Sequence, residues 1–474
     1  MDYKEILKDL RKESSSVKAR LQSILFDNEY VTRFADQCLV ANERCGLWYV
    51  DPKELTHSAY FKSTDGHTGE WKFSMRRLNF HLLALLGEFR NIVLVDSTRK
   101  GKLMPDALLK TVPIWCAVLT YIMYEDDDME IPNDWNSLKS DNWLLTPPEM
   151  VSRSEHAAIA KTIPLHAREL KQLGLITKNA LIAKLGCKSP ILPLWVYPGK
   201  PSQSLGYRPN CFTVCCLTTS YRTSPGFVVP DWNYLYPYVQ GAGDDHELWA
   251  SHDLCGGALS PLFFWTKVLT EKEDDSRIID DDMKIYSWLS EQELKNRLNQ
   301  IYLDHSKSTS SDSLNLEVTQ LGESGLSIGI IKGNVSFDTF RLGAEYSIVI
   351  ILSEKWRVID VPQKCSTKVL QFQVESSKKG SKKLREILPQ ILSNVGELEI
   401  NERVCIACDS GQDLSVAVAL SLLCLQFDLK WLRTTNHQRV NKDIIKQHLA
   451  LISEHRRVNP SRNSLQSVNA SILG

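Results

Sequence analysis

The stretch that decides the fold is Val93–Val118, VLVDSTRKGKLMPDALLKTVPIWCAV. Ile92–Val95 is a short apolar run rich in β-branched residues, which predicts a buried strand. A polar, cationic segment, STRKGK, comes next, and Pro105 then opens a helix whose first turn carries Asp106. The sequence therefore predicts a strand, a basic loop and a helix start in immediate succession.

Such a unit is suited to bind an anion. A helix start has free backbone N–H groups, the basic side chains supply charge, and the glycine lets the backbone approach a ligand closely. The pattern GxxxxGK[ST] is absent, so this is not a Walker A loop. From its chemistry we interpret it as a phosphate or pyrophosphate cradle. The alternative is a solvated basic turn between two core elements. The candidate phosphate-binding residues are Ser97, Thr98, Arg99, Lys100, Gly101 and Lys102.

Length and composition indicate a soluble protein of two or three domains. The chain has 474 residues, 43% of them hydrophobic and 24% charged, and its formal net charge is −1. A nucleic-acid surface must therefore be a local basic patch. The sequence shows no apolar leader and no apolar run of transmembrane length, so we expect a cytoplasmic protein that does not bind a membrane.

The twelve cysteines favour a reduced, structural role. Most of them lie in apolar runs, and the only CxxC pair, Cys405 and Cys408, falls in a predicted strand. Residues three apart on a strand face opposite sides, so this pair cannot share a metal ion.

A second unusual segment, STDGHTG, precedes the central stretch and contains Asp65 and His67. A helix capped by Ser74 is predicted to follow, with Arg76 and Arg77 in its first turns. Cations are unfavourable at a helix start unless an anion offsets them, which marks these arginines as site candidates. The alternative is that they pair with nearby surface carboxylates. Further upstream, the sequence predicts a short strand from Cys45 to Pro52.

Adjacent carboxylates appear again in the segment YPYVQGAGDDHELWA. Asp244 and Asp245 follow a glycine turn and precede a histidine, a set that suits a Mg²⁺ ligand, a general base or a contact to a ribose hydroxyl. The alternative is an acidic helix start.

The C-terminal part predicts a separate α/β domain. Candidate strands lie at 326–331, 346–352 and 404–407, and a serine-rich polar stretch precedes them. We place an N-terminal domain at 1–304, a linker at 305–320 and a C-terminal domain at 321–474.

The loop that starts at Cys408 matches the spacing CxxGxxR[ST] of cysteine-dependent phosphatases, through Gly411 and Ser415. Leu414 stands in place of the phosphate-gripping arginine, and Ala407 replaces the histidine before the cysteine. Without that arginine the thiol loses both phosphate binding and help in forming a thiolate. The sequence therefore predicts a phosphatase-like domain that lacks phosphatase chemistry.

The loop backbone at Ser410 and Gly411 could still hold a phosphate of a nucleic-acid strand. Arg457 and Arg462 add positive charge near the C-terminus. Such residues are usually solvated surface, and a nucleic-acid contact is the competing interpretation.

Several long segments together resemble the fungal and plant initiator-tRNA phosphoribosyl transferases. They are STDGHTGEWKFSMRRLN, VDSTRKGKLMPDALLKTVPIWCAV, QGAGDDHELWA, ACDSGQDLSVAVAL and VNPSRNSLQSVNAS. The resemblance implies transfer of phosphoribosyl from 5-phosphoribosyl 1-pyrophosphate (PRPP) to the 2′-hydroxyl of adenosine 64 of initiator methionine tRNA. It also implies an N-terminal transferase domain and a C-terminal domain that assists tRNA binding, without indicating a protein partner.

Read with this chemistry, the cradle would neutralise the leaving pyrophosphate, with Mg²⁺ carried on that group. A carboxylate should take the proton of the ribose hydroxyl. Asp96 is the first choice for that base or for a Mg²⁺-linked ligand, and the other candidates are Asp106, Asp244 and Asp245. The same pocket would include Asp65, His67, Arg76 and Arg77. The alternatives are a non-catalytic tRNA-binding protein and a phosphatase acting on nucleotide-like substrates.

Overall fold

The computed structural model divides the chain into two compact units. The first comprises Met1–Ser74, Asn79–Gln172 and Ile176–Ser310, and the second comprises Met75–Leu78, Leu173–Leu175 and Ser311–Gly474. Each unit is mixed α/β, in agreement with the predicted class. The residues that the structure describes are 16–125, 135–199, 210–222, 237–244, 254–255, 259–308, 316–331, 335–336, 345–355, 358–359, 367–375, 377–399, 401–434 and 440–474.

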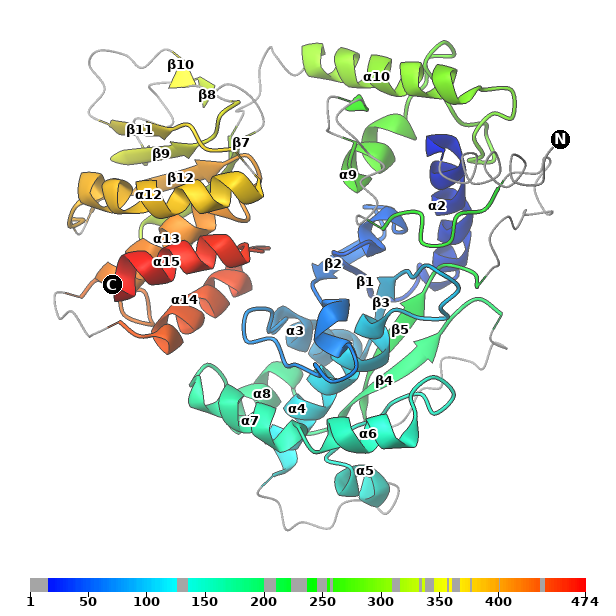
Figure 1. Ribbon diagram of the computed structural model, residues 1–474, viewed down its shortest axis with the longest axis horizontal. Helices are drawn as coiled ribbons and strands as arrows, with labels where there is room; N and C mark the ends of the chain where they lie inside the picture. The colour runs from blue at the N-terminus through cyan, green and yellow to red at the C-terminus, as the bar shows by residue number, and fades with distance from the viewer. Residues whose placement is uncertain are drawn as a thin grey trace. The chain divides into compact units, whose positions relative to one another are not determined.

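The first unit contains a five-stranded sheet in the order β2-β1-β3-β5-β4, with every neighbouring pair parallel (Figure 1). Its strands are β1 (Leu39–Asn42), β2 (Leu55–Ala59), β3 (Asn91–Asp96), β4 (Ile191–Val196) and β5 (Phe212–Thr218). Its helices are α2 (Val17–Val31), α3 (His81–Phe89), α4 (Val112–Tyr124), α5 (Asn136–Ser140), α6 (Arg153–Ala160), α7 (Ile163–Gln172), α8 (Lys178–Leu185), α9 (Pro261–Phe263) and α10 (Glu291–Ser308).

Both faces of this sheet are buried, as is usual for parallel sheets. Val93 and Val95 on β3 belong to a core cluster with residues of α2 and α10. Ile92 and Leu94, which alternate with them, are fully buried on the opposite side. The strand predicted from Ile92 is therefore confirmed.

Two local predictions in this unit are wrong. The region after Cys45 forms a 3₁₀ turn, Gly46–Trp48, because the Gly46 backbone packs directly against the carbonyl of Val95. The helix predicted from Ser74 begins only at His81, so Arg76 and Arg77 precede it and do not lie in its first turn.

Within the described part of the chain, one stretch is long and apolar enough to cross a membrane, contrary to the expectation of none. It runs from Ala107 to Tyr124 and combines a π-helical turn, Ala107–Thr111, with α4. Because 89% of it is buried inside the protein, we interpret it as a core helix.

The second unit contains a sheet in the order β11-β9-β12-β7-β6, in which only β6 is antiparallel to its neighbour. Helices α12, α13, α14 and α15 lie on one face of it (Figure 1). Its strands are β6 (Leu316–Gln320), β7 (Leu326–Ile331), β9 (Ile348–Leu352), β11 (Lys368–Phe372) and β12 (Val404–Cys408), with the short pair β8 (Val335–Ser336) and β10 (Val358–Ile359) beside them in the chain. Its helices are α12 (Lys378–Val395), α13 (Leu414–Gln426), α14 (Lys442–His455) and α15 (Arg462–Leu473).

The boundary between the units falls inside the predicted linker, at Ser310 and Ser311. Helix α10 continues to Ser308 and β6 begins at Leu316, so both ends of the predicted 305–320 segment belong to regular structure. The eleven cysteines that the structure describes are all free. Cys405 and Cys408 belong to different core clusters, as expected for opposite faces of a strand.

Candidate active site

The candidate site lies at the carboxyl ends of β1 and β3. From β1 the chain adds β2 on one side, and the remaining strands continue on the other side of β1. The direction of winding therefore reverses between β1 and β3, and ligands of open α/β sheets bind at such a point. Asn42 ends β1 and Asp96 ends β3, so the predicted cradle starts at this position.

Asp96 is the centre of a buried hydrogen-bond network. Its side chain is fully buried. Its Oδ2 accepts from Asn42 Nδ2 at 2.8 Å, and its Oδ1 accepts from the Ser97 amide at 2.8 Å and from Cys45 Sγ at 2.9 Å. Burial and the carboxylate of Asp96 together raise the pKa of Cys45 well above its usual range. These contacts suit a residue that positions the loop. Because the side chain is fully buried, an incoming hydroxyl could reach it only if the packing around it changed.

Arg44 is the residue that sequence reasoning missed. Its Nη2 lies 3.4 Å from Asp96 Oδ1 and also donates to the Ser97 carbonyl, and its Nη1 lies 3.2 Å from Asp244 Oδ2. Burial disfavours the charged guanidinium, but Asp96 and Asp244 outweigh burial and raise the pKa of Arg44. Arg44 is therefore a fixed cation at the reversal point of the sheet.

Asp244 comes to this site from a distant part of the chain. Its Oδ2 is shared between Arg44 and Arg99, whose Nε is 3.3 Å away. The structure thus brings one of the predicted carboxylates beside one of the predicted cradle cations. Asp245, its predicted partner, lies outside the described residues.

The segment before Asp244 also fixes the cradle loop. The Gly101 amide donates to Gln240 Oε1 at 2.7 Å, and Gln240 Nε2 donates to the Lys102 carbonyl at 2.8 Å. Lys100 and Gly101 both have positive φ, 58° and 70°, so the loop turns sharply at this point. Gly241 packs against the Thr98 carbonyl, 2.5 Å from where a Cβ would lie.

This supporting segment is itself held by α2. Tyr238 Oη donates to Asp27 Oδ1 at 2.7 Å, and the Val239 amide donates to Ser23 Oγ at 2.9 Å. The Gly243 amide donates to Tyr49 Oη at 2.8 Å. Burial raises the pKa of Asp27 well above its ordinary value, and the Tyr238 hydrogen bond opposes that shift.

Asp106 is the centre of a second, more accessible group. Its Oδ2 lies 3.3 Å from Lys102 Nζ and 3.5 Å from His67 Nε2, and its Oδ1 lies 3.4 Å from Lys110 Nζ. The side chain of Asp106 is 16% exposed, compared with none for Asp96. The predicted convergence of the STDGHTG segment with the cradle is therefore observed at His67.

The remaining candidates are placed less centrally. Asp65 makes backbone hydrogen bonds with Lys62 and Lys72 within its own loop. Arg76 and Arg77 belong to the segment grouped with the second unit, where Arg77 Nη2 donates to Asn459 Oδ1 at 3.1 Å. The structure therefore gives Arg77 a partner other than the cradle.

The described residues do not fit a protein-held metal. None of them form a group of three or more histidine, cysteine, aspartate or glutamate side chains that could hold an ion. Asp96 and Asp244 instead contact arginines. A Mg²⁺ ion at this site would have to be held largely by the phosphates of its ligand.

In the second unit, an arginine from another part of the chain lies beside the phosphatase-like loop. The Gly411 amide donates to Cys408 Sγ at 3.2 Å, and Gly411 has a φ of 61°. The Arg456 guanidinium, at the end of α14, packs on Gly411, with Nη2 2.7 Å from where a Cβ would lie, and its Nη1 donates to the Ile328 carbonyl at 2.6 Å. Arg456 therefore supplies a guanidinium beside the loop, in which Leu414 replaces the arginine of the phosphatase motif. The predicted contacts Arg457 and Arg462 are exposed.

The other predicted residue of this loop, Ser410, has its Oγ 3.8 Å from Cys408 Sγ and accepts from the Gln412 amide at 3.2 Å. The segment after Arg456 is fastened to the loop, because Asp413 Oδ1 accepts from the Ser461 amide at 2.8 Å. The loop is thus a well-ordered turn at the start of α13 with one guanidinium beside it.

The first unit is thus an α/β protein in which two arginines and two carboxylates meet at the reversal point of a parallel sheet. The family model for the Rit1 N-terminal domain matches residues 10–306, and that for the Rit1 DUSP-like domain matches residues 368–472. The chain therefore belongs to the Rit1 family, as its motifs predicted, and its C-terminal domain is phosphatase-like.

Full-length relatives agree with this assignment. The chain is 34% identical to the tRNA A64-2′-O-ribosylphosphate transferase of Saccharomyces cerevisiae, over 100% of this chain and 95% of that protein. It is 33% identical to an uncharacterized protein of Schizosaccharomyces pombe, over 96% and 94% of the two chains. Among solved structures, the Yvh1 phosphatase domain from Chaetomium thermophilum is 15% identical with a TM-score of 0.24, covering 32% of this chain and 93% of that chain.

Proposed function

We propose that this protein is a tRNA 2′-O-ribosylphosphate transferase. It takes PRPP with its Mg²⁺ as the donor and transfers phosphoribosyl to the 2′-hydroxyl of adenosine 64 of cytoplasmic initiator methionine tRNA. The modified tRNA is then excluded from elongation. Full-length similarity to the named yeast transferase supports the reaction, and the residue choices come from the site.

The observation that carries the proposal is the convergence of three chain segments on one cationic site. Arg44 follows β1, Arg99 follows β3, and Asp244 arrives from a loop much later in the chain. A donor with a phosphate and a pyrophosphate needs several fixed cations, because charge accumulates on the leaving group as its bond to C1 breaks. Lys100 and Lys102 follow Arg99 in the cradle loop and add two further cations to this part of the chain.

In the proposed reaction, the C1–pyrophosphate bond of the donor breaks and a bond forms between C1 and the ribose 2′-oxygen of the tRNA. The hydroxyl proton passes to a carboxylate, and pyrophosphate leaves with the electron pair of the broken bond. We assign the proton acceptor to Asp106, because it is the partly exposed carboxylate next to the cradle. Asp96, which we expected to be the base, instead positions Arg44 and the loop.

The C-terminal domain contributes to tRNA binding in this proposal. Its loop lies at the start of α13, where the helix dipole favours an anion, and Arg456 adds a guanidinium that can bind a phosphate of the RNA strand.

The deciding experiment is label transfer from 5-phosphoribosyl-labelled PRPP to purified initiator tRNA. It compares Mg²⁺ with chelator and uses elongator methionine tRNA as the control RNA. Mg²⁺-dependent label on the initiator tRNA alone is the expected result. Tight tRNA binding without label would instead show a non-catalytic binder, and release of phosphate from a chromogenic ester would show a phosphatase.

A further inference from the structure

The carboxylate of Asp106 has a nearly buried cation on one side. Lys110 Nζ lies 3.4 Å from Asp106 Oδ1, and the Lys110 side chain is only 7% exposed. The other oxygen, Oδ2, faces the side chains of Lys102 and His67, which are 57% and 51% exposed. These two exposed side chains can rotate toward a ligand, whereas Lys110 cannot leave its place without a change in packing. The two oxygens of Asp106 are therefore held unequally.

Glu155 holds Lys110 from α6. Its Oε1 accepts from Lys110 Nζ at 3.0 Å, from Thr68 Oγ1 at 2.8 Å and from Trp71 Nε1 at 3.3 Å. Burial disfavours the charged carboxylate, but the hydrogen bonds from these three donors outweigh burial and lower the pKa of Glu155. One carboxylate oxygen thus fastens the loop that contains Thr68 and Trp71 to the helical turn that contains Lys110.

The local sequence alone would give Glu155 a different role. Ser152 caps α6 by accepting from the Glu155 amide at 3.2 Å, and the spacing S-x-x-E is that of a capping box. In a capping box the glutamate side chain bonds back to the amide of the capping serine. Here the carboxylate turns instead toward Lys110 and the loop before α3. This geometry indicates a role in the network around Asp106.

The surroundings of Lys110 are costly to build for packing alone. Burying an ammonium group is unfavourable, and an apolar side chain would fill the same space without that cost. Lys110 lies in the π-helical turn Ala107–Thr111, a widened form of helix that is frequent at functional sites. Gly66 packs on this turn so closely that a Cβ would lie 2.7 Å from the Asp106 carbonyl. The turn and the loop therefore form one tightly packed support for Asp106.

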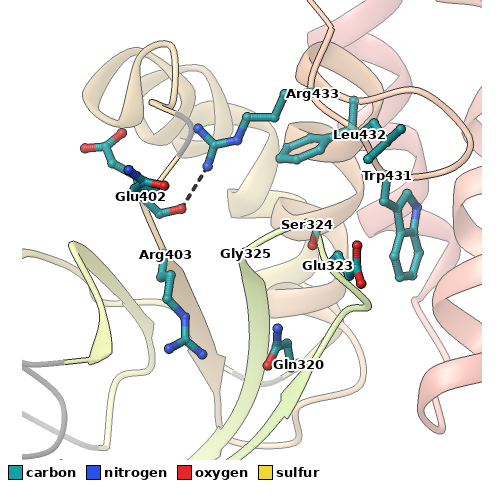
Figure 2. A pocket seen from close by; sticks show the side chains of 11 residues that line it. Gln320, Glu323, Ser324, Gly325, Glu402, Arg403, Trp431, Leu432 and Arg433 are labelled. Atoms are coloured by element: carbon teal, nitrogen blue, oxygen red, sulfur yellow. Dashed lines mark hydrogen bonds between the residues drawn. The ribbon is translucent and has the colours of Figure 1, made fainter.

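A partly buried cation of the second unit shows a contrasting case. Arg433 lines a pocket of about 550 Å³, and its Nη2 donates to the backbone carbonyl of Glu402 at 2.8 Å (Figure 2). Burial lowers the pKa of Arg433, and the charge of Glu402 opposes that shift. Arg433 thus stabilises a loop of its own unit, whereas Lys110 contacts the assigned proton acceptor directly.

We propose that Lys110 and Glu155 are positioning residues for phosphoribosyl transfer, in which Lys110 holds Oδ1 of Asp106 and leaves Oδ2 to take the proton of the tRNA hydroxyl. The O–H bond breaks, its electron pair stays on the oxygen that bonds to C1, and the proton goes to Oδ2. Glu155 acts one step further away, by keeping the Lys110 ammonium in place. This role rests on the proposed function, because it takes Asp106 as the proton acceptor.

Several elements bring charged groups to Asp106. Lys102 comes from the cradle loop, His67 comes from the loop before α3, and Glu155 acts from α6 through Lys110. Three other charged residues of the loop that carries His67 interact with one another: Asp65, Glu70 and Lys72. A histidine can titrate in the same pH range as a catalytic carboxylate, so the experiment must separate His67 from Asp106.

The experiment follows the ionisation of Asp106 in the full-length protein by NMR, with the side-chain carboxyl carbons of aspartate isotopically labelled. The Asp106 signal is the one that Asp106→Asn removes. Lys110→Met removes the adjacent cation, so the titration midpoint should move up by about one pH unit. Glu155→Gln removes a nearby negative charge, so the midpoint should move down by about 0.5 pH unit. The acid limb of kcat/KM for PRPP in label transfer should shift in the same directions.

Two controls accompany these variants. Arg433→Met also removes a partly buried cation, and it should change neither the midpoint nor the acid limb. Both shifts should persist in a His67→Gln background, which removes the titrating histidine.

Shifts in the same direction for Lys110→Met and Glu155→Gln, or no shift in either, would overturn the positioning role, because loosened packing does not reverse its sign between the two variants. If the wild type transfers no label but the NMR midpoints move as expected, the transferase proposal fails and the support of Asp106 by Lys110 stands. If label is transferred and the midpoints do not move, the positioning role fails alone.

Discussion

Arg44 and Asp244 are 200 residues apart in the sequence, and their side chains form an ion pair of 3.2 Å. The same guanidinium reaches Asp96 at 3.4 Å. One arginine thus joins the segment after β1, the end of β3 and the loop that supports the cradle. The site is organised by long-range contacts before any substrate binds, which makes it sensitive to changes in side-chain geometry as well as in charge.

Replacing Arg44 with lysine should therefore lower transfer strongly although the charge is kept. A lysine ammonium cannot bridge Asp96 and Asp244 in the way that the planar guanidinium does. We expect kcat/KM for PRPP to fall by about 10- to 100-fold, the size of effect typical of one lost charge-assisted contact. Steady-state label transfer measures it, with Lys53→Ala at an exposed position as the control. A variant with wild-type kcat/KM would exclude Arg44 from the site.

Asp96, which ends β3, and Asp106, which follows the cradle loop, should respond differently to substitution by asparagine. Asp96→Asn removes the charge that compensates a buried guanidinium, so it should lower the free energy of unfolding by about 3 kcal/mol. Asp106→Asn changes a side chain that is 16% exposed and should lower kcat by about 10²-fold with little change in stability. Urea unfolding and label transfer separate the two effects. If Asp96→Asn unfolds like the wild type but loses turnover, Asp96 is the base after all.

Local sequence signals predicted much of the fold. The apolar, β-branched runs that became β3, β7, β9 and β12 are unambiguous because both faces of a parallel sheet are buried. The shift from strand to basic loop to helix at Asp96 also predicted the start of the site.

What the sequence could not show is which distant residues meet. Arg44 follows a strand of only four residues, Leu39–Asn42, and no periodic pattern marks it. Arg456 stands beside Arg457 in the sequence, and only the packing of α14 determines which of them faces Gly411. Both contacts depend on tertiary structure, which a motif search does not contain. The sequence did indicate the convergence of His67 with the cradle, because both segments are loops next to consecutive helices.

Gly241→Ala tests the contact between the supporting segment and the cradle. Gly241 has a φ of 69°, and an added Cβ would lie 2.5 Å from the Thr98 carbonyl. The cradle must shift, so the KM for PRPP should rise about tenfold. Gly186→Ala is a matched control, because Gly186 has a φ of 77° with open space around its would-be Cβ. Both variants carry the same backbone strain, and only the first should affect donor binding. Equal KM values in the two variants would contradict this contact.

Asp27→Asn should change how stability depends on pH. Burial raises the pKa of Asp27 well above its ordinary value of 3.8. Between these two values the folded state binds a proton that the unfolded state has released, so wild-type stability falls as pH rises. Asparagine keeps an acceptor for Tyr238 and does not titrate. The variant should therefore gain stability relative to the wild type from pH 5 to pH 8, as urea unfolding at several pH values would show. Parallel curves for the two proteins would contradict a proton on Asp27; Asp36→Asn, at an exposed position, is the control.

The C-terminal loop is expected to bind and not to react. Cys408 is fully buried and its thiol accepts from the Gly411 amide, while Ser415 Oγ lies 3.1 Å away. Serine at this position keeps an acceptor of similar shape, so Cys408→Ser should leave the rate of label transfer within about twofold of the wild type. Arg456→Ala removes the one guanidinium on the loop and should weaken tRNA binding about tenfold while the KM for PRPP stays constant. Steeper loss of tRNA affinity at low salt than at high salt would identify the lost contact as a phosphate contact. A large loss of transfer in Cys408→Ser would show instead that the thiol takes part in chemistry.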